Sequence, residues 1–306
     1  MTATLLIEQL LNGLQFGLML FLIAAGLTLV FGIMDVLNLA HGSLYMIGAY
    51  LAATIAQASG SFWIALPAAV VATGLIGLLL EITLMRRLYR RDHLAQVLAT
   101  FAVILIADDS VRLLWGPAPI LLSAPAALSG PVQILPGVLY PAYRLLIIAV
   151  GLVLALALYL FIAHTRTGML VRAGSSNRDM ARLMGARVER LFAIIFMLGA
   201  MLSAVAGALL GPLLAVEIGM GENILILALV VIVIGGIGSI RGAFVGAVLV
   251  GLVDTAGRAF LPDVLNHFLA GAVAAQLGPA LAAIAIYVLM AAVLFLRPQG
   301  LFPARA

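Results

Sequence analysis

The feature that most constrains the fold is a long run of residues near the N-terminus that carries no charge. It extends from Gln9 to Met34 and is almost wholly apolar. An α-helix rises about 1.5 Å per residue and the hydrocarbon core of a bilayer is about 30 Å thick, so this run is long enough to cross a membrane. A cleavable secretory signal would have basic residues before a shorter apolar core. No basic residue precedes the run, and we interpret it as a membrane span.

Similar apolar stretches recur along the chain, each close to the length of a transmembrane helix. We expect nine spans: Leu10–Ile33, Ser43–Ala58, Phe62–Met85, Leu94–Trp115, Leu145–Ala163, Leu191–Leu214, Asn223–Ile240, Ala243–Phe260 and Ala280–Leu296. The second stretch is short, which leaves eight or ten spans open. Because a helix satisfies its own backbone hydrogen bonds in lipid, the sequence predicts an all-α polytopic transmembrane helix bundle.

The composition excludes several classes of function. Hydrophobic residues make up 65% of the chain and charged residues only 9%, whereas a soluble domain carries about 25% charged residues. All 16 basic residues are arginine, so the chain has no lysine for an ATP-binding phosphate loop or for a Schiff base. It also has no cysteine for a disulfide or a thiolate metal site. The chain therefore does not hydrolyse ATP through such a loop, and any ATP hydrolysis would belong to a separate protein. We also expect no enzymatic activity, no cofactor and no metal.

Residues 116–143 differ from the rest of the chain. They hold six of the twelve prolines and no charge before the arginine that follows them. Proline at this density excludes a continuous helix, and unpaired backbone is too costly in lipid. We expect an external loop that separates two similar halves of one transmembrane domain, which would cover residues 1–306.

The arginines predict the orientation of the chain. Most of them lie in two short segments that flank the fourth and fifth spans: Arg86, Arg87, Arg90 and Arg91 in the first, and Arg166, Arg172, Arg178, Arg182, Arg187 and Arg190 in the second. Short basic loops stay in the cytoplasm. Counting spans from them puts the N-terminus outside and the C-terminus in the cytoplasm. The pI near 9.8 therefore reflects topology, and we expect no nucleic-acid partner.

Polar residues interrupt the apolar sequence between the first two predicted spans. Asn38, His41 and Gly42 stand there, just after Asp35. Polar groups at membrane depth need protein or a water-filled cavity to satisfy them, so the break is a candidate for the translocation pathway. The alternative is an interfacial turn with His41 in headgroup water. A general-base role for His41 is not supported, because no serine or carboxylate lies at a useful spacing.

A second interruption is rich in glycine. Gly235, Gly236 and Gly238 precede Arg241, and each glycine weakens a helix by roughly 1 kcal/mol relative to alanine. One interpretation is a discontinuous helix beside the translocation pathway. The other is a tightly packed turn, since small residues let helices approach closely.

The basic segment 164–190 contains the signals of a short helix. Asn177 ends a group of three residues that offer capping oxygens, and Gly185 can end a helix. The expected helix covers Asn177–Met184. Its apolar side chains share one face at helical spacing: Met180, Leu183 and Met184. A helix this short is marginal in water, so this face would dock on the membrane surface or in a groove of a cytoplasmic partner.

Charged and hydroxyl groups inside the spans leave two other classes open. Asp108 and Asp109 stand in the fourth span, and we favour an outer salt bridge of Asp108 with Arg112 over a cavity role. An ion-coupled carrier needs ionisable residues in mid-span, and the ionisable groups here lie near span ends. An intramembrane hydrolase would need a base opposite Ser203, and we expect no histidine at the depth of that serine.

Several motifs together resemble one family. The stretches are Gly26–Gly32 followed by Asn38–Gly42; Arg172-Ala173, Asn177, Met180-Ala181 and Gly185; Gly235–Ser239; and Leu296–Phe302. In this order they are similar to the permease subunit of branched-chain amino-acid ABC importers. The element Asn38-Leu39-Ala40-His41-Gly42 resembles the first of the two paired permeases in such systems.

The resemblance implies a permease in the bacterial inner membrane that works with separate subunits. The implied partners are a second permease, two cytoplasmic ABC ATPases, a periplasmic binding protein, membrane lipid and a small amino-acid substrate. Contact with the ATPase would involve Arg172, Asn177, Met180, Ala181, Leu183, Met184 and Gly185. The pathway would involve Asn38, His41, Gly42, Gly235, Gly236 and Gly238. The alternatives are a permease for urea or short amides and an ion-coupled secondary transporter.

Overall fold

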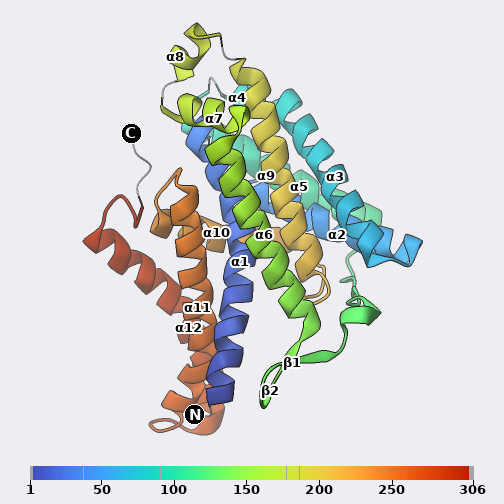
Figure 1. Cartoon of the computed structure of the whole chain (residues 1–306), viewed down its shortest axis with the longest axis vertical. Coiled ribbons are helices and arrows are strands. Elements are labelled where there is room, and N and C mark those ends of the chain that lie inside the picture. The colour runs from blue at the N-terminus through green and yellow to red at the C-terminus, as the bar shows by residue number, and fades with distance from the viewer. Residues whose placement is uncertain (1–2, 37, 90, 177, 186, 303–306) are drawn as a thin grey trace.

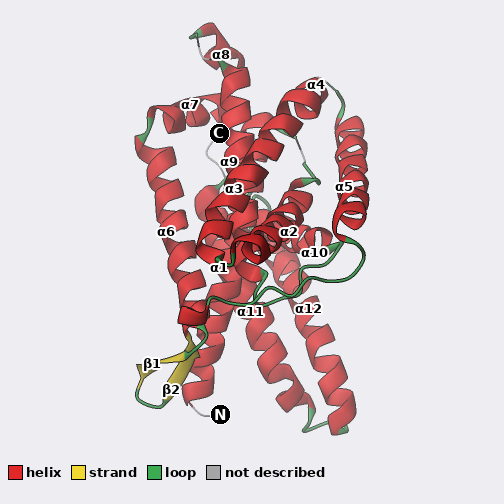
Figure 2. Ribbon diagram, turned by 90° about the vertical axis from the view of Figure 1, so that its right-hand side faces the viewer, coloured by secondary structure: helices red, strands yellow, loops and turns green. Residues whose placement is uncertain are grey.

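The computed structural model describes residues 3–36, 38–89, 91–176, 178–185 and 187–302. The helices in this part are α1 (Ala3–Met34), α2 (His41–Ser59), α3 (Phe62–Leu80), α4 (Arg86–Leu88), α5 (His93–Trp115), α6 (Ala142–His164), α7 (Arg166–Ser176), α8 (Arg178–Leu183), α9 (Val188–Leu210), α10 (Met220–Gly235), α11 (Ile240–Leu265) and α12 (Gly271–Leu296). A π-helical segment, Glu81–Met85, joins α3 to α4. The long helices follow the long axis of the molecule (Figures 1 and 2).

The first helix is the centre of the bundle. α1 is apolar on every side, as a helix must be to be surrounded by others. Of an 18-residue apolar stretch of this helix, 83% is buried inside the protein. The helix contacts α6, α9, α10 and α11. In the peripheral helix α12, only 11% of such an 18-residue stretch is buried. Its exposed apolar side chains would be costly in water but suit a surface that faces lipid.

Glycines allow these helices to pack backbone against backbone. A Cβ atom added to Gly251 of α11 would lie 2.4 Å from the carbonyl oxygen of Gly13 in α1, and one added to Gly17 of α1 would lie 2.8 Å from the carbonyl oxygen of Ala247. Apolar burial gives no net attraction between helices that are already in lipid, so close contact through small residues becomes a main source of association. The α1–α11 contact therefore requires glycine, in which a hydrogen atom takes the place of a side chain.

Each of the nine predicted spans overlaps one long helix, and the seventh, Asn223–Ile240, also runs through the turn after α10 to the first residue of α11. The helices are not equivalent. Among the described residues, six segments are long and apolar enough to cross a membrane: Thr4–Met34, Phe62–Leu88, Ala142–His164, Val188–Leu210, Ile240–Leu265 and Gly271–Leu296. α10 is apolar but short, and its 16 residues span about 24 Å. α2 and α5 carry more polar residues. The chain is therefore a polytopic helical membrane protein, with six spans supported by length and composition.

Several boundaries differ from the prediction. α9 and α10 end at Leu210 and Gly235, four and five residues before the predicted span ends. α12 begins at Gly271 rather than Ala280, with Pro279 inside the helix, and α11 continues to Leu265 rather than Phe260. The two helices meet where Gly278 faces Pro262, because a Cβ on Gly278 would lie 2.5 Å from the Pro262 ring. The apolar sequence pattern does not locate these ends, since both helices continue past their most apolar parts.

The proline-rich segment forms no continuous helix, but it is not structureless. It contains a 3₁₀ turn, Ala126–Leu128, and an antiparallel hairpin of β1 (Pro131–Leu135) and β2 (Val138–Pro141). Ile120 also pairs with Val216 in the segment between α9 and α10. The hairpin lies at the end of the molecule where α1 begins (Figures 1 and 2). The sequence did not predict it.

The glycine contacts make a prediction for stability. We expect Gly251→Ala to destabilise the folded protein by about 1–3 kcal/mol, because the added methyl group overpacks the α1–α11 contact. Gly130→Ala is the matched control, since Gly130 has open space around it. The measurement is the thermal unfolding midpoint of both variants in detergent. An unchanged midpoint for Gly251→Ala would show that the helices can separate without cost.

Candidate functional site

The break between α1 and α2 turns the chain back into the bundle. α1 ends at Met34, and Asp35 has a φ of 53°, a left-handed conformation that aspartate tolerates better than most residues. A turn at Asn38–Ala40 follows, in which the backbone N–H of His41 donates to the carbonyl of Asn38 over 3.3 Å. Asn38 is fully buried. α2 therefore begins inside the protein and not at its surface.

The side chain of His41, the first residue of α2, lies between α1 and α9. Its ring occupies the space left by Gly26 of α1 and Gly199 of α9: a Cβ on Gly26 would lie 2.6 Å from His41 Nε2, and one on Gly199 would lie 3.1 Å from Cε1. His41 Nε2 and Ser203 Oγ of α9 are 2.8 Å apart and form a buried hydrogen bond. We call Gly26, Gly199 and Ser203 the histidine socket.

The socket corrects two expectations from the sequence. His41 has no exposed surface, so the alternative that placed it in headgroup water is wrong. The expectation that no histidine reaches the depth of Ser203 is also wrong, because it took α2 to begin at the membrane surface. Among the described residues no carboxylate is hydrogen-bonded to the ring. The pair thus lacks the third group that would activate a serine nucleophile.

The first turns of α2 and α10 touch each other through glycine. A Cβ on Gly42 would lie 2.2 Å from the carbonyl oxygen of Gly221, and one on Gly221 would lie 2.3 Å from the carbonyl oxygen of Gly42. Gly219, which precedes α10, has a φ of 84°. The two helices that follow a break in the chain therefore start side by side, next to the histidine socket.

The second glycine group packs against two other segments. Gly235 and Gly242 face each other across α10 and α11, with added Cβ atoms 2.3 and 2.1 Å from the partner's backbone oxygen. Gly236 and Gly238 have φ values of 105° and 81°. The Ser239 hydroxyl accepts a hydrogen bond from the Gly242 N–H at the start of α11. The packed-turn interpretation accounts for these contacts.

The C-terminal motif also belongs to this turn. The backbone N–H groups of Leu301 and Phe302 donate to the carbonyls of Ile234 and Gly235, each over 2.9 Å. These carbonyls are at the end of α10, where no further helical turn can satisfy them. The tail therefore completes the hydrogen bonding of α10, a role that the sequence did not reveal.

The basic segment 164–190 forms two helices where one was predicted. α7 lies across the end of the bundle (Figure 2), with Val171 buried and Gly174 against Ile33 and Leu191. Arg172 is exposed and donates from Nη1 to the carbonyl of Ile162. The sequence missed α7, since the predicted capping residues stand at its end.

α8 projects beyond α7 at the same end (Figures 1 and 2). It covers Arg178–Leu183, close to the predicted Asn177–Met184, although Asn177 itself lies outside the described residues. Met180 is 56% exposed and Leu183 and Met184 are each 82% exposed, whereas Ala181 is buried. Gly185 has a φ of 87° and ends the turn as predicted. The apolar face that the spacing predicted is thus presented to the outside.

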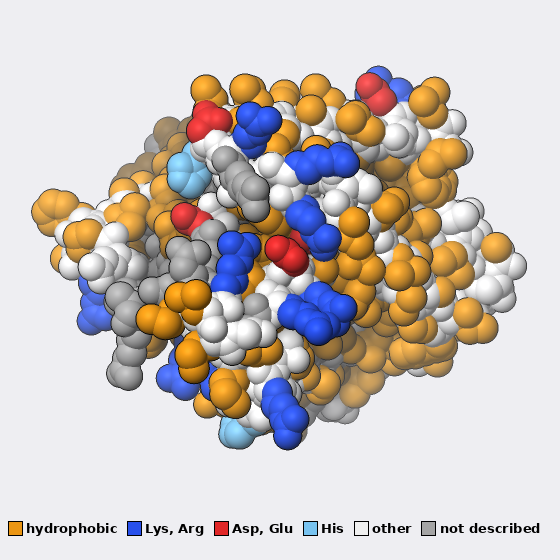
Figure 3. All heavy atoms as spheres, turned by 90° about the horizontal axis from the view of Figure 1, so that it is seen from above, with side chains coloured by type: hydrophobic (Ala, Val, Ile, Leu, Met, Phe, Trp, Pro, Cys, Tyr) orange, Lys and Arg blue, Asp and Glu red, His pale blue; other side chains and the backbone are white. Residues whose placement is uncertain are grey.

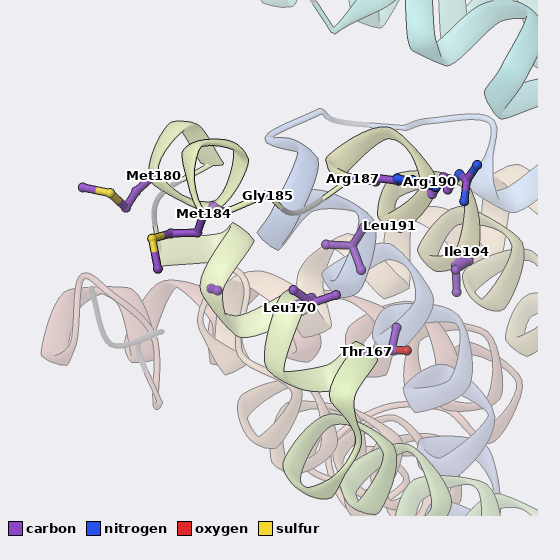
Figure 4. Close-up of a pocket in the computed structure, with 11 residues that line it drawn as sticks. Thr167, Leu170, Met180, Met184, Gly185, Arg187, Arg190, Leu191 and Ile194 are labelled. Carbon is purple, nitrogen blue, oxygen red and sulfur yellow. The ribbon is translucent and has the colours of Figure 1, made fainter.

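A groove runs between α7, α8 and the start of α9 (Figure 4). Its volume is about 800 Å³, within the range of about 300–1,000 Å³ that is common for ligand sites. Apolar residues line most of it: Leu170, Ala173, Met180, Ala181, Met184, Leu191 and Ile194. Thr167, Gly185, Arg187 and Arg190 complete the lining.

A buried carboxylate marks the same end of the bundle. Glu81, in the π-helical segment, is fully buried, and its carboxylate lies 3.3 Å from Arg86 Nη2 and 3.1 Å from the hydroxyl of Tyr89. Burial, and then the charge of Glu81, raises the pKa of the Tyr89 hydroxyl, which therefore keeps its proton and donates it to Glu81. The Tyr89 ring contacts Phe192 of α9 edge to face, with centroids 5.1 Å apart. This cluster was not predicted.

The acidic pair in α5 differs in one detail from the prediction. Arg112 pairs with Asp109 over 3.8 Å, and both side chains are mostly exposed. The predicted partner was Asp108. At i, i+3 spacing the pair is a surface salt bridge of small energetic value.

The chain is similar to permeases of known transport systems. Residues 9–294 match the family described as branched-chain amino acid transport system / permease component. The high-affinity branched-chain amino acid transport system permease protein BraD of Pseudomonas aeruginosa is 31% identical over 271 residues, which cover 84% of this chain and 88% of BraD. LivH of Escherichia coli, with the corresponding description, is 30% identical over 83% of this chain and 87% of its own.

The similarity extends to an archaeal protein. A probable branched-chain amino acid transport permease protein LivH of Methanocaldococcus jannaschii is 28% identical over 245 residues, or 78% of this chain and 76% of the relative. No solved structure matches the chain.

The histidine socket makes a second prediction. Ser203→Ala leaves the buried His41 ring without its hydrogen bond between α2 and α9, so we expect a loss of about 1–2 kcal/mol in the free energy of unfolding. Ser59→Ala is the control, because the Ser59 hydroxyl bonds the backbone of Ile55 in its own helix and of Ser61 in the exposed turn that follows. Thermal unfolding in detergent measures both. Equal midpoints for the two variants would mean that the His41–Ser203 bond contributes nothing.

Proposed function

The chain belongs to the permease family of branched-chain amino-acid transport systems, and we propose that it forms one half of the membrane pathway of an ATP-driven importer for branched-chain or other aliphatic amino acids. The family match over residues 9–294 carries this proposal. The protein is a multi-pass membrane permease component and not an enzyme. The partners would be a second permease, two ABC ATPases and a periplasmic binding protein.

The proposed topology has nine spans in one domain of residues 1–306, with two similar halves, the N-terminus outside and the C-terminus in the cytoplasm. Segment 116–143 would be external and segment 164–190 cytoplasmic. Exposed arginines support this orientation, since they gather at the end that carries α4, α7 and α8 (Figure 3). They are Arg86, Arg87, Arg91, Arg166, Arg172, Arg182, Arg187 and Arg190. Basic segments of this kind remain in the cytoplasm.

Coupling to the ATPase is assigned to α8 and its neighbours. The high exposure of Leu183 and Met184 supports the assignment, because a helix of six residues does not hold such side chains in water without a partner. The contact would comprise Arg172, Asn177, Met180, Ala181, Leu183, Met184 and Gly185. α9 begins a few residues after α8 and packs on α1, α2 and α3. A push on α8 would therefore tilt α9 and with it the helices of the pathway.

The pathway is assigned to the region where the discontinuous helices meet. Transporters commonly bind substrate where broken helices begin in mid-membrane, and the contact between Gly42 and Gly221 supports such a location. Asn38, His41, Gly42, Gly235, Gly236 and Gly238 would lie beside the path. The two groups pack at opposite ends of α10, Gly42 against Gly221 and Gly235 against Gly242, so transport would require that these contacts open. The aliphatic side chain of such an amino acid would suit apolar surroundings, whereas urea has no hydrocarbon group that could use them.

Coupling can be tested with a double variant on α8. In proteoliposomes that contain the full transporter and its binding protein, we expect ATP-driven uptake of leucine and not of urea. Leu183→Glu with Met184→Glu should abolish uptake and ATPase stimulation and weaken ATPase binding by about 30-fold or more, as loss of a buried hot spot does. The matched control exchanges the same side chains conservatively, Leu183→Met with Met184→Leu. Normal uptake by the charged variant would contradict the assignment, and uptake of urea alone would contradict the substrate.

Access to the pathway can be tested with single cysteines, because the natural chain has none. We expect Asn38→Cys to react with small water-soluble thiol reagents at least about tenfold faster during ATP turnover than at rest, since the open conformation is a minor state at rest. Ala53→Cys, at a buried position of α2, is the control and should stay inert. If Asn38→Cys is inert in every nucleotide state, the break is purely structural.

A further inference from the structure

The groove between α7, α8 and α9 has different chemistry on its two sides. Figure 4 shows Arg187 and Arg190 on the α9 side and Met180 and Met184 on the α8 side. Both arginines are exposed. Leu170 is 42% and Ile194 is 40% exposed, so the apolar part of the lining is accessible. Glu189, on the same turn of α9, is exposed but does not line the groove.

The depth of the groove in the membrane follows from the positions of Asn12 and Ile33 on α1. At one end, the Asn12 side chain accepts hydrogen bonds from Tyr140, which follows the β-hairpin turn, and from Arg144. At the other end, Ile33 lies beside Gly174 of α7, which also contacts Leu191 of α9. The helix between Asn12 and Ile33 is about 32 Å long, close to the thickness of the hydrocarbon core of about 30 Å. Leu191 therefore lies near the cytoplasmic boundary of that core.

The lining residues of α9 thus follow the polarity of the membrane. Ile194 is about 4–5 Å deeper than Leu191, and Arg187 is about 6 Å further out, by the rise of the helix. Ile194 faces the depth of acyl chains, and Arg187 lies at the depth of phosphates. Arg190 directly precedes Leu191, and its long side chain can extend the guanidinium group toward the same level. Arginine binds phosphate through paired, charge-assisted hydrogen bonds.

We propose that this groove binds one anionic phospholipid, with the phosphate at Arg187 and Arg190 and the first part of an acyl chain against Leu170, Leu191 and Ile194. Basic pockets between helices on the cytoplasmic side commonly bind anionic headgroups. A peptide segment of the ATPase fits less well, because it would have to reach Ile194 below the membrane boundary. The site goes beyond the proposed coupling function. The groove shares Met180, Ala181, Met184 and Gly185 with the proposed ATPase contact, so the lipid would lie on the α9 side, beside that contact.

The test is retention of lipid by the purified complete transporter. Native mass spectrometry would count the phosphatidylglycerol that stays bound after detergent exchange, with phosphatidylcholine as the neutral comparison. Each arginine near an anionic headgroup contributes roughly a fivefold gain in affinity. We expect Arg187→Gln with Arg190→Gln to weaken phosphatidylglycerol binding by about 30-fold. Ala173→Trp, which fills the groove without changing the charge, should also expel the lipid.

The matched control is Arg87→Gln with Arg91→Gln, which removes the same charge from the same end of the protein, outside the groove. It should retain phosphatidylglycerol as the wild type does. Retention by both groove variants would overturn the proposal, and so would equal retention of phosphatidylcholine. Competition by millimolar inorganic phosphate would show a simple anion site. Lipid that binds only after removal of the ATPase subunits would show that an ATPase segment fills the groove.

Discussion

Close contact between helix backbones is the constraint on which the rest of the structure depends. Helices in lipid gain little from burying apolar surface against each other, so packing at short range has to hold them together. The contacts of Gly13 with Gly251, Gly42 with Gly221 and Gly235 with Gly242 all bring backbone atoms to distances that a Cβ atom would block. Glycine is unfavourable inside a helix by up to about 1 kcal/mol. Here that cost is offset by contacts that no larger residue allows.

One helix connects the end of the molecule that carries α7 and α8 to the interior. α9 begins beside α8, contacts Tyr89 through Phe192, and carries Gly199 and Ser203 of the histidine socket deeper in the bundle. His41 in turn stands at the first residue of α2, which touches α10 through glycine. A rigid helix that reaches from an exposed surface to a junction of broken helices can transmit a displacement without any flexible link. This continuity is the physical basis for assigning coupling to α8.

The sequence predicted the features that depend on local hydrogen bonding and missed the tertiary contacts between residues far apart in the chain. All nine apolar runs contain a helix, because lipid leaves the backbone few alternatives. The exposed face of α8 and the positive φ of Gly185 followed from spacing and from the chemistry of helix ends. The re-entry of α2, the His41–Ser203 bond and the pairing of Leu301 and Phe302 with α10 join residues far apart in the chain. The spacing of apolar residues along the sequence does not reveal such pairs. The motifs 38–42 and 235–239 stand at breaks between helices, but their contacts were not predictable, and their place beside a pathway stays a prediction.

In the proposed orientation, the charges at the end that carries α7 and α8 would serve two neighbouring surfaces with different solvents. α8 would present its exposed apolar side chains to the cytoplasm, for a protein partner to cover, whereas the α9 side of the groove would reach the depth of the lipid. Leu183 ends α8 and Val188 begins α9, so the two surfaces are close together in the chain. Arg187 and Arg190 stand where α9 begins, and their charge would keep the start of α9 at the level of the phosphates. A helix held at that depth would give α8 a fixed base, so that a force on α8 would tilt α9 instead of drawing it out of the membrane.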